Sequence, residues 1–262
     1  MDRYGSVESY AETKSTLYTG AAGRVYNLDD PRVMAMRRGE GEERFFTLQE
    51  PVENVFGISR RNDEDWLSYG DVLLLPVSEV KMPGRHNWAN VLAALAMGDL
   101  LGLSMPAMLE AVRSFTGLPH RTEYVAERND VRWYNDSKGT NVGACVAALN
   151  GFACGPIAGK TVLIAGGDGK GADFTPMIEA VSRSVRAVIL LGRDGLLIGQ
   201  ILGDAAPKFH VESMQQAVTQ ADELAQPGDR VLLSPACASF DMYRDYQQRG
   251  EFFMDAVRRL VR

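Results

Sequence analysis

The sequence predicts an α/β protein whose second half is built around an open parallel sheet. From about residue 118 onward, short apolar runs alternate with helical patterns, which is the order typical of successive βα units. These runs are continuously apolar rather than alternately apolar and polar, which indicates strands covered by helices on both faces. Before residue 118, several strand-like runs follow one another, so we expect a separate domain there.

The first half is predicted to begin with a helix over residues 6–18, because Ser6 can cap its amino end and apolar residues recur at helical spacing. The predicted strands that follow are four short runs at 24–28, 44–48, 55–58 and 72–76. The first of these runs ends at the turn signal Asp29-Asp30-Pro31. Stop and start signals around Gly102 then separate two predicted helices, at 87–101 and 105–114.

The segment Thr116–His120 contains both Gly and Pro and is the predicted hinge between the two halves. The strands expected after it are 123–126, 132–135, 161–165, 187–191, 209–211 and 230–234. A turn at Asn129-Asp130 joins the first two of them, and helices are expected between the others, the first over 142–149. An amphipathic helix over 246–261 closes the chain.

Composition excludes several classes of function. The chain has 262 residues with 45% hydrophobic and 24% charged residues, which is typical of a folded globular protein. Its formal net charge of −6 argues against a general nucleic-acid binder, which needs a concentrated basic face. We expect no membrane association, because no stretch approaches the roughly 20 apolar residues of a membrane-spanning helix. Residues 1–10 do not resemble a secretory signal.

The cysteines and histidines argue against disulfides and zinc. The three cysteines are Cys145, Cys154 and Cys237. Their odd number and lack of paired spacing predict free thiols in a reducing compartment, and therefore a cytoplasmic protein. The three histidines are His86, His120 and His210. None has the spacing to another His or Cys that a zinc site requires.

Three polar loops follow predicted strands of the second half. They are Asn135–Asn141, Gly166–Asp173 and Ser234–Asp241. In open parallel sheets, ligands bind at the carboxyl ends of the strands. Any one of these loops could be an ordinary turn rich in Gly, Asp and Ser. Three of them at one edge favour a ligand cleft in which lysines, acids and hydroxyls converge.

The glycine-rich loop partly matches two cofactor-binding motifs, the dinucleotide pattern and the ATP phosphate-loop pattern. Gly167–Ala172 matches the dinucleotide pattern GxGxx(G/A), but Arg193 rather than an acid follows the next strand. The ATP phosphate-loop pattern fails, because Ile164 replaces its first glycine and Gly171 replaces its hydroxyl residue. We therefore interpret Lys170 as a point charge that grips a carboxylate. An NADP-binding oxidoreductase remains an alternative for this loop.

At these loops the sequence resembles the Mur ligase family, the ATP-dependent amino-acid ligases of peptidoglycan synthesis. The matching stretches are Met1–Tyr4, Gly84–Asn87 with Asn90, Gly117–Arg121, Asn135–Gly143, Gly166–Phe174, Leu233–Asp241 and Gln248–Gly250. The runs NDSKGTN and LLSPACASFD are the most specific of them. The sequence DNPR, typical of the diamino-acid-adding branch, is absent. The resemblance is therefore strongest to the branch that adds D-glutamate.

The resemblance implies a three-domain enzyme of which this chain holds two parts. Residues 1–117 would form the back half of the central ATP-binding domain. Residues 118–262 would form a complete, Rossmann-like carboxyl-terminal domain that binds the amino acid, D-glutamate. The family's UDP-binding domain, phosphate loop and magnesium-binding Glu have no match here, so we expect a fragment that is inactive alone.

The resemblance also implies roles for individual residues. Lys14 and Lys138 match catalytic lysines, and Lys14 matches one whose carbamate supports a second Mg²⁺. The residues that match ATP contacts are Asn87, Asn90, Arg121 and Asp136. The residues that match the D-glutamate pocket are Thr140, Lys170, Ser239 and Tyr246. His120 could equally be a packing residue of the hinge or a nucleotide contact.

For the complete enzyme, the resemblance implies ATP and Mg²⁺ as cofactors and UDP-N-acetylmuramoyl-L-alanine and D-glutamate as substrates. ATP would phosphorylate the substrate carboxylate, and the amine of D-glutamate would attack the acyl phosphate. We expect a cytoplasmic monomer. The alternatives are another Mur ligase, a relative of folylpolyglutamate synthase, or a non-catalytic binding module.

Overall fold

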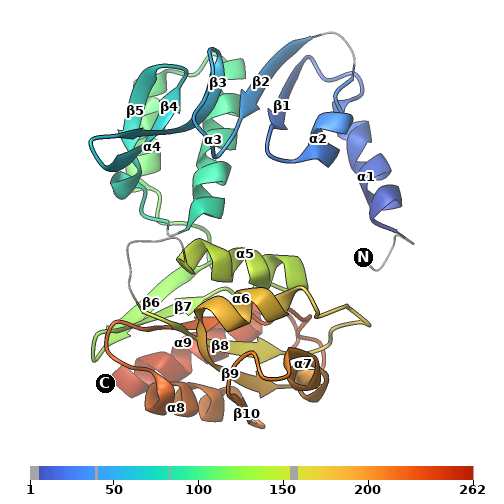
Figure 1. The fold of residues 1–262 in the computed structure, drawn as a ribbon, viewed down its shortest axis with the longest axis vertical. Coiled ribbons are helices and arrows are strands. Elements are labelled where there is room, and N and C mark those ends of the chain that lie inside the picture. The colour runs from blue at the N-terminus through green and yellow to red at the C-terminus, as the bar shows by residue number, and fades with distance from the viewer. Residues whose placement is uncertain (1–5, 39–40, 83, 154–158, 262) are drawn as a thin grey trace. The chain divides into compact units, whose positions relative to one another are not determined.

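The computed structural model describes residues 6–38, 41–82, 84–153 and 159–261, and it divides into two compact units (Figure 1). One unit consists of residues 1–81 and 85–116, and the other of residues 82–84 and 117–262. The boundary at 116/117 falls in the segment that sequence predicts as a hinge. The stretch Met1–Tyr4 and the thiol of Cys154 lie outside the described residues.

The first unit contains a five-stranded sheet in the order β1-β2-β3-β4-β5. Its strands are β1 (Gly23–Asn27), β2 (Glu42–Phe46), β3 (Val55–Arg61), β4 (Glu64–Tyr69) and β5 (Val72–Pro76). The first three strands run parallel, whereas β4 is antiparallel to both of its neighbours. The helices of this unit are α1 (Val7–Ser15), α2 (Pro31–Ala35), α3 (Arg85–Leu100) and α4 (Met105–Ser114), with short 3₁₀ turns at Thr16–Tyr18 and Val77–Glu79.

Two elements of the first unit were not predicted. Strand β4 begins with Glu64-Asp65, and acidic residues are depleted in strands. It forms because it pairs along its length with β3 through the turn at Asn62-Asp63. Helix α2 begins where the sequence predicted the end of a strand. The Asp30 carboxylate caps it by accepting hydrogen bonds from the amides of Arg32 and Val33, at 2.9 and 3.3 Å.

The second unit contains a six-stranded sheet in the order β10-β9-β8-β11-β7-β6. Its strands are β6 (Glu123–Arg128), β7 (Val131–Asn135), β8 (Thr161–Gly166), β9 (Val185–Leu191), β10 (Lys208–His210) and β11 (Arg230–Leu233). All pairs are parallel except β6–β7, a hairpin whose turn residues Asn129 and Asp130 have φ of 52° and 59°. The predicted α/β class is confirmed, and the one difference from a fully parallel sheet is the antiparallel edge strand β6.

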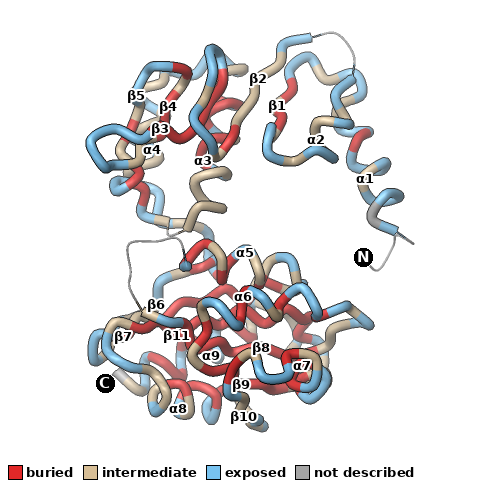
Figure 2. Tube along the Cα trace, in the orientation of Figure 1, coloured by how far each residue is buried: buried red, intermediate tan, exposed pale blue. Residues whose placement is uncertain are grey.

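Helices cover both faces of this sheet, as Figure 1 shows. They are α5 (Val142–Ala153), α6 (Met177–Ser184), α7 (Gly195–Leu202), α8 (Met214–Leu224) and α9 (Tyr246–Val261). Neighbouring strand residues point to opposite faces: Leu163 joins the core under α5, α6 and α7, whereas Ile164 joins the core under α8 and α9. Both faces of the central strands are therefore buried (Figure 2).

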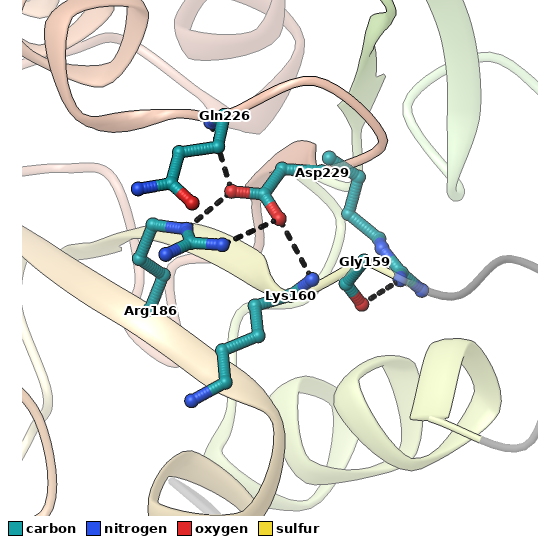
Figure 3. Close-up of polar contacts among 6 residues, drawn as sticks. Gly159, Lys160, Arg186, Gln226 and Asp229 are labelled. Atoms are coloured by element: carbon teal, nitrogen blue, oxygen red, sulfur yellow. Dashed lines mark hydrogen bonds and ion pairs between the residues drawn. The ribbon is translucent and has the colours of Figure 1, made fainter.

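A buried carboxylate fastens the amino ends of three strands (Figure 3). Asp229 is only 2% exposed and accepts hydrogen bonds from the amides of Lys160 and Gln226, at 2.8 and 3.0 Å. It also forms an ion pair with Arg186 at the start of β9. We call these four residues the Asp229 clamp. Because it lies at the amino ends of parallel strands, it is at the edge opposite to the one where ligand loops are expected.

The thiols of Cys145 and Cys237 are buried and unpaired. Burial is the main reason that the pKa of each is raised to about 12. Neither is therefore a reactive thiolate at neutral pH. In the described part of the chain, no helix has the length and apolar character needed to cross a bilayer.

Candidate functional site

The three polar loops follow three adjacent strands of the second sheet. Strand β11 lies between β8 and β7 and runs parallel to both. The loops 166–173, 234–241 and 135–141 therefore leave the same edge of the sheet side by side. We call them the strand-end loops.

Backbone hydrogen bonds join the first two strand-end loops. The amide of Asp168 donates to the carbonyl of Ala238, and the amide of Ala238 donates back to Asp168, both at 2.9 Å. Gly166 donates to the carbonyl of Pro235 at 2.9 Å. The glycine-rich loop is therefore held directly against the loop that contains Ser239.

The third loop is joined to the middle one in the same way. Asp136 donates to the carbonyl of Leu233 at 2.8 Å, and Ala236 donates to the carbonyl of Gly139 at 3.0 Å. The hydroxyl of Ser234 donates to Oδ2 of Asp136 at 2.7 Å. A Cβ at Gly139 would come within 2.6 Å of Asp136 Oδ2, so only glycine permits this close approach.

Lys170 and Ser239 lie at neighbouring positions of this joined surface. The Lys170 side chain is exposed, and its ammonium lies 5.7 Å from the ring centre of Phe240. Ser239, the residue next to Phe240, is only 3% exposed. The loops after β8 and β11 thus bring the Lys170 ammonium near the Phe240 ring, one residue from Ser239. A cation with a hydroxyl nearby is a combination suited to a carboxylate.

Lys138 and Tyr246 meet on the other side of the same edge. The ammonium of Lys138 lies 4.3 Å from the ring centre of Tyr246, a cation–π contact. The Ser137 hydroxyl donates to the Tyr246 carbonyl at 2.8 Å and so ties this loop to the start of α9. Thr140, half-buried, belongs to the same loop. Thr140, Lys138, Lys170, Ser239 and Tyr246 are therefore all on one edge of the second unit.

Asp136 lies beneath this edge, in surroundings that disfavour the charged form of its carboxyl group. It is 8% exposed, and burial is the main reason that its pKa is raised to about 6. The opposing influences are hydrogen bonds from Ser234 and from the Thr122 amide, and the charges of Arg121 and Arg249. Arg121 itself is exposed.

His120 has packing contacts within the second unit. It is buried, and its ring nitrogen Nδ1 lies 2.9 Å from the Asn135 side-chain nitrogen. Its ring also meets that of Tyr246 edge to face, at 5.9 Å between centres. The amide of His120 donates to the Glu123 carboxylate at 2.8 Å. These contacts favour the packing role that sequence left open.

The remaining candidates belong to the first unit. Lys14 is exposed on the last turn of α1, with its ammonium 5.3 Å from the ring centre of Tyr10. Asn87 and Asn90 lie one turn apart on α3, and the side-chain nitrogen Nδ2 of Asn90 donates to Asn87 Oδ1 at 3.3 Å. The structure therefore places these three candidates on the first unit. The other seven lie on the second unit: Arg121, Asp136, Lys138, Thr140, Lys170, Ser239 and Tyr246.

Sequence reasoning assigned no role to Arg249, which lies at the centre of the strand-end loops. It is 2% exposed and donates to the Ser137 hydroxyl at 3.0 Å, to the Ser137 carbonyl at 2.9 Å and to the Cys237 carbonyl at 3.1 Å. A sequence signal exists: Arg249 shares the helix face of the buried residues Phe253 and Val257, where an arginine is unexpected.

The donor set suits anions better than a metal. Lys138, Lys170, Arg121 and the buried Arg249 bring positive charge to one edge, where a phosphate or carboxylate would be stabilised. Within the described ranges, no group of three His, Cys, Asp or Glu side chains could hold a metal ion.

Two protein families match the chain in succession. The family described as the Mur ligase middle domain matches residues 1–98. The family described as Mur ligase, glutamate ligase domain, matches residues 120–237. Together these matches cover most of both units.

Curated relatives align with nearly the whole chain. The UDP-N-acetylmuramoylalanine–D-glutamate ligase of Nitrosococcus oceani is 48% identical over 261 residues, which is 100% of this chain and 57% of the relative. The ligase of the same name from Pseudomonas aeruginosa is 46% identical over 261 residues, 58% of its length. The chain therefore spans less than two thirds of the relatives it matches.

Solved structures share the fold. A MurF ligase of Thermotoga maritima in complex with ADP has a TM-score of 0.70 and 16% identity, over 98% of this chain and 59% of that one. The UDP-N-acetylmuramate–alanine ligase of the same organism has a TM-score of 0.68 and 16% identity, over 98% and 56%. At these identities the likeness concerns the fold alone.

Proposed function

Because this chain belongs to the Mur ligase family, we propose that it is part of a UDP-N-acetylmuramoylalanine–D-glutamate ligase of peptidoglycan synthesis. In this proposal, residues 118–262 form the D-glutamate-binding domain and residues 1–117 contribute to the ATP-binding domain. The observation that supports it most is the joined edge where Lys170 lies beside the Ser239 loop. The names of the relatives at 46–48% identity point to the same substrate.

The proposed reaction needs no covalent nucleophile from this chain. ATP transfers its γ-phosphoryl group to the carboxylate of UDP-N-acetylmuramoyl-L-alanine. The amine of D-glutamate attacks the acyl carbon, and inorganic phosphate leaves as the amide forms. Lys170 and Ser239 would hold the carboxylates of D-glutamate, and Thr140 and Tyr246 would border it, so that its amine is oriented for attack.

Other residues would act on the nucleotide. Asn87 and Asn90 would contact adenine, and Arg121 and Asp136 the phosphate and ribose. The Lys138 ammonium would neutralise charge near the reacting phosphoryl group. For Mg²⁺, the proposal concerns only Lys14: a carbamate on this lysine would be an anionic ligand, whereas a bare ammonium would repel the cation.

The isolated chain should have no ligase activity. No stretch of it fits the phosphate-loop pattern GxxxxGK(S/T). The nearest stretch, Cys154–Thr161, has Cys in place of the first glycine and leads into strand β8 rather than into a helix. A phosphate loop requires a helix amino end after the lysine.

A chimera tests the proposed function. This chain would replace the matching 58% of the Pseudomonas aeruginosa relative, and phosphate release would be measured with ATP and UDP-N-acetylmuramoyl-L-alanine. We expect release that depends on D-glutamate and not on L-glutamate. Lys170→Ala should raise the Michaelis constant for D-glutamate about tenfold or more, since it removes a charge-assisted contact of roughly 1.5–3 kcal/mol.

Two controls accompany the chimera. Lys208→Ala removes a lysine from the edge strand β10, which is three strands away from β11, and should leave the Michaelis constant unchanged. The isolated 262-residue chain should release no phosphate. Turnover with L-glutamate in place of D-glutamate would instead favour a relative of folylpolyglutamate synthase.

A further inference from the structure

One buried side chain contacts all three strand-end loops. The guanidinium of Arg249 donates two hydrogen bonds to Ser137 and one to the Cys237 carbonyl, which belong to two different loops. It also lies against the third: a Cβ at Gly167 would be 3.3 Å from Arg249 Nη1. Gly167 has φ of 127° and no side chain, so the glycine loop can approach this closely.

The environment of Arg249 is unusual for a residue whose role is limited to packing, because a charged guanidinium is buried there. Its hydrogen-bond acceptors are a hydroxyl and two carbonyl oxygens rather than a carboxylate. Burial lowers its pKa to about 10, so it remains charged at neutral pH. Burying such a charge costs free energy that an apolar residue would not incur. Its planar fork, however, can bind acceptors in several directions at once.

We propose that Arg249 is the positioning residue of the strand-end loops, which its guanidinium fixes relative to one another so that Lys138, Lys170 and Ser239 face a single ligand. The identity of that ligand as D-glutamate rests on the proposed function, whereas the fixing of the loops does not. Arg249 acts through the loops and does not itself touch the substrate.

Hydrogen exchange of the 262-residue chain tests the positioning role. Arg249→Lys keeps the charge but replaces the fork by a single ammonium, which cannot bind both loops in the same way. We expect amides of 135–141, 166–173 and 234–241 to exchange at least about tenfold faster, while strands β8 and β9 keep their protection. In Arg249→Ala, millimolar methylguanidinium should restore slow exchange in the three loops.

Arg186→Lys is the matched control. It alters another arginine contact, the ion pair of the half-buried Arg186 with the buried Asp229 at the opposite sheet edge. It should lower the stability of the unit without loosening the three loops selectively. If the Arg249 variants do not fold, Ser137→Ala removes the hydroxyl that accepts from Arg249 and donates to the Tyr246 carbonyl, and it should loosen the same loops about two- to fivefold.

A ligand measurement separates this inference from the proposed function. Saturation-transfer NMR would report D-glutamate binding to the parent chain and to Arg249→Lys, where we expect binding at least about tenfold weaker. If the loops loosen in Arg249→Lys but the parent chain does not bind D-glutamate, the proposed function is refuted and the positioning role stands. The inference would be overturned if the three loops of the Arg249 variants exchanged as slowly as in the parent chain. It would also be overturned if the whole sheet lost protection together with the loops.

Discussion

Among single residues, Asp136 differs most from what its place in the sequence indicates. The sequence presents it as one acid in a polar loop after a strand. In the structure it is buried, and it accepts hydrogen bonds from the Ser234 hydroxyl and the Thr122 amide. Burial outweighs these bonds and the nearby arginines, and its pKa rises from 3.8 to about 6. A charged Asp136 therefore lowers the stability of the folded chain.

We predict that Asp136→Asn stabilises the chain at neutral pH. Because the folded pKa exceeds the ordinary value, the folded state binds the proton more tightly. The contribution of this group to stability therefore falls as pH rises from about 4 to about 6. Asn should raise the free energy of unfolding at pH 7.5 by up to roughly 3 kcal/mol. Urea unfolding at several pH values measures it, and a gain that grows as pH falls would contradict the account.

The secondary-structure elements show where sequence patterns are sufficient. Strand β5 at 72–76 and helix α4 at 105–114 have the predicted bounds, because each is a strong pattern between clear turn or cap signals. Strand β4 and helix α2 were missed, because pairing with β3 and capping by Asp30 outweigh weak local propensities. Register and pairing are tertiary properties that a single sequence does not display.

The Asp229 clamp gives a prediction at this scale. Burial raises the pKa of Asp229, but the hydrogen bonds from Arg186, Gln226 and Lys160 outweigh it, and the pKa is lowered. Its stabilisation is therefore present above the ordinary pKa and is lost as pH falls through the lowered folded value. Asp229→Asn should cost about 2–3 kcal/mol at pH 7, because it leaves Arg186 without its counter-ion.

Asp255→Asn is the matched control for the clamp. Asp255 forms an exposed ion pair with Arg258 on α9, at 3.7 Å, and its loss should cost less than about 0.5 kcal/mol. Denaturant unfolding followed by circular dichroism compares the two variants. Equal effects would show that the clamp contributes no more than a surface pair.

For the molecule as a whole, the position of the candidate site follows from the sequence through one rule. Loops after adjacent parallel strands gather at one edge, and the strands that lead to Asn135–Asn141, Gly166–Asp173 and Ser234–Asp241 are adjacent. The order of strands and the hydrogen-bond partners of Arg249 were not predictable, because both depend on contacts between distant segments. The roles of individual residues came from the family resemblance rather than from spacing.

The central claim is that these three loops bind D-glutamate. Its most direct test is backbone NMR of the 262-residue chain titrated with D-glutamate, with L-glutamate and the Lys170→Ala chain as controls. We predict saturable shifts confined to residues 135–141, 166–173, 234–241 and the start of α9, weaker with L-glutamate and abolished by Lys170→Ala. Shifts elsewhere, or equal shifts with both enantiomers, would contradict it.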